Sequence, residues 1–159
     1  MRKYMPQESN LTEKNNKKIY VVIDTNVFVS ALISRNEDAA TVRVFNAFMK
    51  GIVTPLYHEG ILAEYDEVLH RPKFHFNEDL IRYILIHIKR IGIRISPTPT
   101  EEEFIDKKDV IFYEVVLTKK DDGAWLVTGN DRHFPKKHFV VTPREFMDIL
   151  DGMNHYNNM

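Results

Sequence analysis

The sequence contains no cysteine among its 159 residues. This absence excludes disulfide scaffolds, cysteine-ligated zinc and iron–sulfur sites, and thiol catalysis. It fits a reducing compartment. The chain also lacks any apolar run long enough to span a membrane or to form the core of a signal peptide. We therefore expect a cytoplasmic protein with no membrane partner.

An excess of either charge is also missing. The chain has 22 Lys and Arg residues against 23 Asp and Glu residues, a formal net charge of -1. A basic surface over the whole chain, on which non-specific nucleic-acid binding depends, is therefore excluded, and any such contact must be local. The HExxH, GxSxG, Walker A and GxGxxG motifs are absent, so zinc-protease, acyl-transfer and nucleotide-binding functions have no support.

What is present describes an ordinary globular protein, with 43% hydrophobic and 28% charged residues. A chain of this length is enough for one domain with a core on both sides of a sheet. Residues 1–17 have little to bury, and we expect them to form a polar leader. We expect a single domain over residues 18–151 and a polar C-terminal tail over residues 152–159.

Apolar runs alternate with helical patterns along the chain. The pattern predicts helices at 38–51, 59–71, 77–91, 108–120 and 143–151. Apolar strands are predicted at 18–24, 52–57, 124–130 and 139–142, with a further strand candidate at 93–96. This alternation predicts an α/β fold in which helices cover both faces of a central parallel sheet.

Polar residues end two of the predicted strands. Asp24 and Asn26 follow "IYVVI", and the segment Thr128–Asp131 follows "AWLV". In parallel α/β sheets the ligand crevice lies beyond the carboxyl ends of the strands, so these residues are site candidates. The alternative for Asp24 is a helix N-cap, because Asp is favoured there and "VFVSAL" is compatible with a helical turn. The local sequence leaves both interpretations open.

Two further acidic positions lie on predicted helices. Glu64 and Asp66 flank opposite edges of the apolar stripe of the helix at 59–71, and helical geometry does not choose between them. Asp106 and Asp109 lie at the start of the helix at 108–120, where N-capping is the strong alternative to a functional role. Glu64 or Asp66, together with Asp109, is thus a candidate partner of Asp24.

Several carboxylates around one cavity repel each other unless a cation neutralises them. Ligation by oxygen alone favours Mg²⁺ or Mn²⁺ over zinc or copper. Such an ion activates water and stabilises the charge that develops on a phosphodiester. If the acids converge, the chemistry they indicate is hydrolysis of a phosphate ester.

Four segments carry a family resemblance: "VVIDTNVFVSAL", "LAEYDEVLHRPKF", "DKKDVIFYEVVL", and "AWLVTGNDRHF" followed by "VVTPREFMDIL". In order and spacing they resemble the PIN-domain ribonucleases, most closely the toxin components of prokaryotic toxin–antitoxin pairs. The resemblance covers Ile19 to Leu150. It implies a three-layer α/β/α sandwich and a Mg²⁺- or Mn²⁺-dependent endonuclease acting on single-stranded RNA. It also implies inhibition by a cognate antitoxin protein and a possible homodimer.

The resemblance also implies the site residues. Asp24 matches the first catalytic acid, Glu64 the acid of the "LAEY" helix and Asp109 the third acid, and all three would be metal ligands. The fourth acidic position is where this chain departs, because Asn130 stands there and Asp131 follows. Asn130 offers an amide oxygen without charge, which would weaken metal binding, and Asp131 would replace it as a metal ligand if the turn allows.

Asn26 and Thr128 are expected to support the acids, although a strand-end hydroxyl without a special role is an equal alternative for Thr128. Two segments, "HRPKFHF" and "RHFPKKHF", mix basic and aromatic residues, which suit phosphates and unpaired bases. The candidate RNA-binding residues are Arg71, Lys73, Arg132, Lys136 and Lys137, and the alternative is two solvated loops. The competing prediction is a catalytically weak PIN-like module that binds RNA or a protein. The presence of Asn130 at the fourth acidic position favours this alternative, whereas the presence of Asp24, Glu64 and Asp109 argues against it.

Overall fold

The computed structural model describes residues 17–157 of the chain. The predicted leader, apart from Lys17, lies outside the described residues. None of the helices in this part of the chain is long and apolar enough to cross a membrane.

The centre of the molecule is a sheet of five parallel strands in the order β3-β2-β1-β4-β5. Val22 pairs with Leu126 and Ile23 with Val127, so β1 and β4 end side by side. The predicted parallel sheet is therefore confirmed, including the short strand in "IRIS". The strands are β1 (Tyr20–Ile23), β2 (Thr54–Tyr57), β3 (Ile93–Arg94), β4 (Trp125–Val127) and β5 (Val140–Val141).

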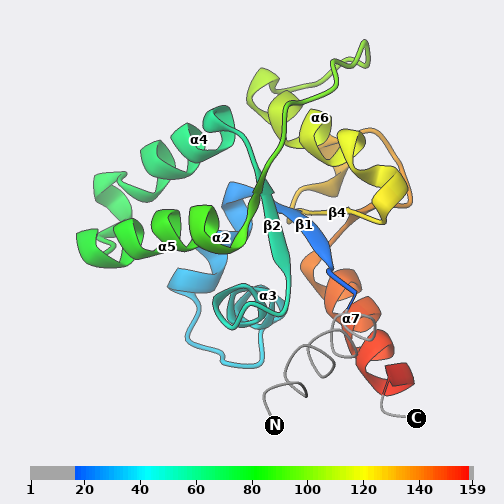
Figure 1. Ribbon diagram of the computed structural model, residues 1–159. Coiled ribbons are helices and arrows are strands. Elements are labelled where there is room, and N and C mark those ends of the chain that lie inside the picture. The colour runs from blue at the N-terminus through cyan, green and yellow to red at the C-terminus, as the bar shows by residue number, and fades with distance from the viewer. Residues whose placement is uncertain (1–16, 158–159) are drawn as a thin grey trace, which may run out of the picture.

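Six helices surround the sheet, and the fold is a three-layer α/β/α sandwich. Helix α6 packs against β1, β2 and β4, while α3 and α7 pack against each other on the opposite side of the sheet (Figure 1). The helices are α2 (Thr25–Ile33), α3 (Ala40–Met49), α4 (Glu59–Leu69), α5 (Glu78–Ile91), α6 (Val110–Thr118) and α7 (Pro143–Asn157).

The core explains why the apolar runs take these positions. Val21, Val22 and Ile23 of β1 are all buried, as expected for a central parallel strand covered on both faces. On one side of the sheet, Phe28 of α2 makes edge-to-face contacts with Phe48 of α3 and Tyr65 of α4 at centroid distances of 5.3 and 5.0 Å. Edge-to-face packing of this kind fixes the relative positions of three helices beside the end of β1.

Some element boundaries differ from those predicted. The segment after Asp24 forms the complete helix α2 rather than a single turn. Helix α7 continues through Asn157, past the predicted end at Asp151, so the predicted polar tail is largely helical. An exposed helix tolerates polar residues and a single glycine such as Gly152, which costs about 1 kcal/mol relative to alanine. The composition of the segment therefore does not show where such a helix ends.

Candidate active site

The ends of β1 and β4 bring Asp24 and Thr128 together. The Asp24 amide donates to the carbonyl of Val127 at 2.9 Å, continuing the ladder between the two strands. Above this ladder the Thr128 hydroxyl donates to Asp24 Oδ2 at 2.7 Å, and both side chains are buried. The Asn130 amide in turn donates to Thr128 Oγ1 at 3.0 Å. The hydroxyl of Thr128 therefore holds the Asp24 carboxylate in place.

The capping alternative for Asp24 is wrong. Asp24 occupies the N-cap position of α2 with extended backbone angles, but its side chain makes no capping hydrogen bond. Its carboxylate is instead bonded to Thr128 and to Asn26 Nδ2, the latter at 3.3 Å. Burial raises the pKa of Asp24, and the hydrogen bond from Thr128 opposes that rise. The carboxylate is therefore retained at an energetic cost that a helix cap does not require.

Asn26 connects this carboxylate to the turn after β4. Its amide nitrogen donates to Asp24, and its Oδ1 accepts a hydrogen bond from the Gly129 amide at 3.1 Å. A Cβ atom on Gly129 would lie 3.4 Å from the same Oδ1, so a larger residue would crowd this contact. Asn26 thus acts as a support between two strand ends, as its position in the sequence predicts.

Asp109 lies directly before α6, where N-capping was the main alternative to a functional role. Its neighbour Asp106 is the residue that caps: the Asp106 carboxylate accepts a hydrogen bond from the Lys108 amide at 2.9 Å, at the start of the 3₁₀ turn Lys107–Asp109. Asp109 makes no capping hydrogen bond, and its Oδ2 is buried without a hydrogen-bond partner. A buried carboxylate oxygen without a donor is uncommon and calls for a ligand or a functional reason.

The carboxylates of Asp24, Glu64 and Asp109 share one electrostatic environment. Burial, together with the negative charges of Asp24, Asp106 and Glu64, raises the pKa of Asp109 to about 6. Burial also raises the pKa of Glu64, against the nearby charges of Lys108 and Arg71. The charges of Asp24 and Glu64 thus act on Asp109, and burial opposes the ionisation of all three carboxyl groups.

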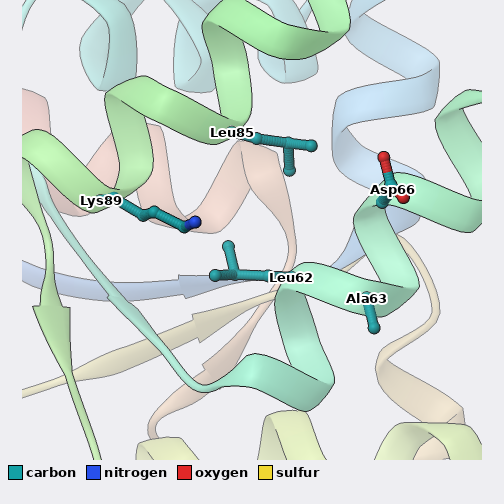
Figure 2. Close-up of a pocket in the computed structure, with 5 residues that line it drawn as sticks. All are labelled: Leu62, Ala63, Asp66, Leu85 and Lys89. Carbon is teal, nitrogen blue, oxygen red and sulfur yellow. The ribbon is translucent and has the colours of Figure 1, made fainter.

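Asp66, the alternative to Glu64, faces a different part of the molecule. Its Oδ1 lies 3.1 Å from His70 Nδ1, and its side chain borders a shallow groove of about 340 Å³ between α4 and α5. Figure 2 shows Leu62 and Leu85 facing each other across this groove, with Lys89 beside them. The structure thus separates Glu64 from Asp66, which helical periodicity alone did not.

Asn130 and Asp131 are both exposed. In the described part of the chain neither side chain hydrogen-bonds to Asp24 or Asp109; Asn130 contributes only its backbone amide, to Thr128. Asp131 begins the 3₁₀ turn Asp131–His133, in which its carbonyl accepts from the Phe134 amide at 3.1 Å. This turn directs the fourth position outward, so the structure does not bring either side chain into the group of three acids.

His133 is a site residue that the sequence analysis did not single out. Its Nδ1 lies 3.7 Å from Asp109 Oδ2, and its positive form would lower the pKa of both Asp109 and Asp24. The signal in the sequence that pointed to His133 was its position in the first turn after β4. The structure then shows that this turn brings the histidine close to Asp109, which precedes α6.

The residues of the two basic and aromatic segments differ in whether they are free to contact RNA. Within residues 17–157, Arg71, Lys73, Arg132 and Lys136 take part in no ion pair, whereas Lys137 lies 3.7 Å from Glu102. The expectation that aromatics of both segments are available for base stacking is wrong for the second. Phe134 and Phe139 are only 6% and 4% exposed, because they pack into the core.

The candidate donors suit a divalent cation in their chemistry rather than in their spacing. Among the described residues, no three His, Asp or Glu side chains are grouped as closely as they would be around a bound ion. The candidate donors are nevertheless carboxylate oxygens, which hard cations prefer, and Asp109 Oδ2 accepts no hydrogen bond, with His133 Nδ1 3.7 Å away. A cation bound by these carboxylates would relieve the repulsion that contributes to the raised pKa of Asp109.

Comparison with known proteins identifies the family. A family model described as PIN domain matches residues 20–132, which is more than half of the chain and includes all three acids and the turn after β4. No curated protein and no solved structure matches. PIN domains are in general metal-dependent nucleases, so the match indicates a nuclease-type function with a nucleic-acid substrate. Because the match covers more than half of the chain, the chain belongs to the PIN-domain family.

Proposed function

We propose that this chain is an endoribonuclease that hydrolyses phosphodiester bonds of single-stranded RNA with Mg²⁺ or Mn²⁺ as its cofactor. The observation that carries the proposal is the buried Oδ2 of Asp109, which has no hydrogen-bond partner and belongs to a carboxyl group whose pKa is raised to about 6 by burial and neighbouring acids. Acids arranged in this way destabilise the metal-free protein, and a divalent cation would offset that cost.

Asp24, Glu64 and Asp109 would hold the cation. A bound Mg²⁺ or Mn²⁺ supplies an activated water and stabilises negative charge on a phosphodiester. The hydrogen bonds from Thr128 and Asn26 keep the Asp24 carboxylate aimed at the common centre. His133 Nδ1 lies 3.7 Å from Asp109 Oδ2 and, when protonated, would help to orient this carboxylate. These supports restrict the acids to one geometry before the substrate arrives, which lowers the cost of reaching the transition state.

Asn130 and Asp131 stand at the fourth position, and a ligand role for Asp131 requires its side chain to turn inward. The positive charges of Arg71, Lys73, Arg132 and Lys136 would bind phosphates on either side of the cut. Lys137 would have to leave Glu102 to do the same. These residues supply the local basic surface that a chain of net charge -1 needs in order to hold RNA.

The decisive assay is cleavage of a 5′-labelled, unstructured RNA in Mn²⁺, Mg²⁺ or EDTA. Asp24→Asn and Glu64→Gln remove proposed ligands, and loss of several kcal/mol of charge stabilisation reduces cutting by about 100-fold or more. Asp66→Asn is the matched control, because Asp66 lies on the same helix but beside the groove, and we expect cutting within about twofold of the wild type. Equal cutting by wild type and Asp24→Asn in every metal would refute the proposal.

Thermal unfolding provides a measurement that does not depend on choosing the right RNA. A cation that binds only the folded state stabilises it, and the melting temperature rises with the logarithm of the cation concentration above the Kd. We expect Mn²⁺ to raise the melting temperature of the wild type and of Asp66→Asn, but not of Asp109→Asn. Identical melting temperatures of the wild type with Mn²⁺ and with EDTA would indicate that the three acids do not form a cation site.

The toxin role is a further part of the proposal, and it rests on the resemblance of the four sequence segments. In this role the protein acts in the cytoplasm, as a homodimer, until a cognate antitoxin binds it. Expression in a bacterial host tests the role: the wild type should arrest growth, Asp24→Asn should not, and co-expression of the neighbouring open reading frame should restore growth. Normal growth on expression of an active wild-type nuclease would refute it.

The second candidate is a PIN-like module that binds RNA or a protein without cutting. The exposed amide of Asn130, in the place where an acid was expected, favours it. Asn130→Asp discriminates between the two functions. If the wild type is a weak nuclease limited by this position, the added charge strengthens metal binding and raises cutting. Tight RNA binding with no cutting in either variant supports the binding module.

A further inference from the structure

The loop Arg71–Phe76, between α4 and α5, presents a pair of stacked aromatic rings. The rings of Phe74 and Phe76 lie 5.2 Å apart with an interplanar angle of 12°. Phe76 packs against the core, whereas Phe74 is half-buried, and the Nζ atom of Lys73 lies 5.1 Å from the centroid of its ring. Phe74 thus stacks on the ring of Phe76, which packs against the core, and contacts the ammonium group of Lys73. Phe74 itself is only half-buried.

The backbone holds this pair firmly. Pro72 begins a 3₁₀ turn, and His75 has a φ of 55°, a left-handed conformation that is uncommon for a residue other than glycine. The ends of the loop are also fixed. His70 Nε2 lies 2.5 Å from Glu78 Oε2, and Asn77 caps α5 by accepting from the Asp79 amide at 2.7 Å. A ring held in this way loses little conformational entropy when a ligand stacks on it.

The loop also carries charge toward the acidic site. Arg71 is close enough to Glu64 to lower the pKa of that acid. Arg71 and Lys73 form no ion pair within the described residues, so both are available for phosphates. The loop follows directly on α4, the helix that carries Glu64, and His70 is the C-cap residue between them.

We propose that Phe74 is the platform of a base-binding subsite, in which one unpaired base of the bound strand stacks on its ring. This inference rests on the proposed nuclease function. Lys73 moves off the ring to contact a phosphate, and Arg71 contacts the phosphate nearer the acids. A base inside a duplex has both faces covered, so only a single strand uses the platform. The subsite therefore gives the nuclease its preference for unpaired substrate.

Three other aromatic residues among the described ones differ from Phe74 in exposure or in position. Phe134 and Phe139, in the second basic segment, are buried. Tyr83 is 44% exposed on α5, but it stacks on His87 and lies outside the loop. Tyr83 therefore provides the matched control: an exposed aromatic ring of similar size that should not bind a base.

The test is equilibrium binding in the Asp24→Asn background, where cutting does not interfere. The ligands are a short unstructured RNA, the DNA of the same sequence, and the RNA annealed to its complement. Phe74→Leu keeps the apolar volume but removes the ring face, and stacking of one base predicts a loss of about 5-fold to 150-fold in single-strand affinity. Duplex affinity should not change. Tyr83→Leu should bind like the parent, and equal loss for RNA and DNA would assign the subsite to the base rather than to the ribose.

Phe74→Trp gives an independent measurement, including the case in which Phe74→Leu fails to fold. The larger ring should retain affinity, and stacking of an unpaired base should quench its fluorescence relative to the parent, which contains Trp125 alone. An abasic nucleotide moved stepwise along the RNA should weaken binding to the parent at one position and should have no further effect at that position on Phe74→Leu. Unchanged single-strand affinity in Phe74→Leu with no quenching in Phe74→Trp would overturn the inference.

The two proposals fail in different ways. A chain that cuts nothing in any metal, but loses single-strand affinity in Phe74→Leu, retains the subsite and refutes the nuclease. A chain that cuts RNA with the same KM and the same affinity in Phe74→Leu retains the nuclease and refutes the subsite.

Discussion

Replacing Asp109 with asparagine should stabilise the metal-free protein. The rise in the pKa of this carboxyl group from 3.8 to about 6 corresponds to about 3 kcal/mol against its charged form at neutral pH. Solvent at the edge of the sheet screens part of this cost, which leaves about 1–2 kcal/mol. The 3.7 Å contact with half-exposed His133 offsets less than about 1 kcal/mol when the histidine is charged. Asp109→Asn is nearly isosteric and should therefore raise the melting temperature in EDTA by about 2–6 °C.

The pH dependence of this effect has a definite sign. A carboxyl group whose pKa is raised by folding binds its proton more tightly in the folded state. Its destabilising effect is therefore complete above about pH 6 and disappears as the pH falls through 3.8. The gain in stability from Asp109→Asn should be largest at pH 7–8 and should shrink steadily toward pH 4.

The assay is urea unfolding in EDTA at several pH values between 4.5 and 8, for the wild type and Asp109→Asn. Asp148→Asn is the control, because Asp148 is an exposed acid on α7, far along the chain from the site. We expect a change of less than about 0.5 kcal/mol for this control at every pH. The reasoning is refuted if Asp109→Asn is less stable than the wild type at pH 7.5, or if its gain in stability does not depend on pH.

Two further predictions concern packing and hydrogen bonding around the same sheet. Thr128→Val removes the buried hydrogen bond to Asp24 and should cost about 1–3 kcal/mol in urea unfolding at pH 7.5, because the carboxylate stays buried with one fewer donor; a change below about 0.5 kcal/mol would show that the bond contributes little. Gly92→Ala would place a Cβ atom 2.4 and 2.6 Å from two backbone oxygens, and overpacking of this kind should cost about 1–3 kcal/mol or more. In Gly152→Ala nothing lies within 4 Å of the new Cβ atom in α7, so this substitution should stabilise the folded state by about 0.5–1 kcal/mol. The melting temperatures of the Gly92→Ala and Gly152→Ala variants, each compared with that of the wild type, check both predictions.

Periodicity and turn chemistry predicted most of the fold. The β-branched run Tyr20–Ile23 became the central strand β1 because residues buried on both faces of a parallel sheet must be apolar. The predicted ends of helices were less accurate. Helix α7 extends to Asn157 because an exposed helix needs no apolar face in its last turns and meets no proline there. A boundary of this type depends on backbone hydrogen bonding, which residue composition records poorly.

For the candidate site, the sequence identified the acids, but it did not show what each of them contacts. Asp24 and Asp109 were open to interpretation as helix caps, because an acid before a helix satisfies the same local rule whether it caps or not. The structure shows that Asp24 bonds to Thr128 and that Asp106 takes the capping position at the turn before α6. His133 escaped notice because its partner, Asp109, is distant in sequence and close only after folding.

The sequence by itself determined the class of the protein: the absence of cysteine and long apolar runs, the alternation of strands and helices, and acids at the ends of apolar runs. Tertiary structure alone decided which acids meet. It placed the Asp24 carboxylate against Thr128 and Asp109 near His133, placed Asp66 beside the groove between α4 and α5, and left Asn130 and Asp131 exposed. The physical reason is that local sequence fixes the type of each element, whereas the electrostatic cost of gathering carboxylates arises only when strands and helices pack together.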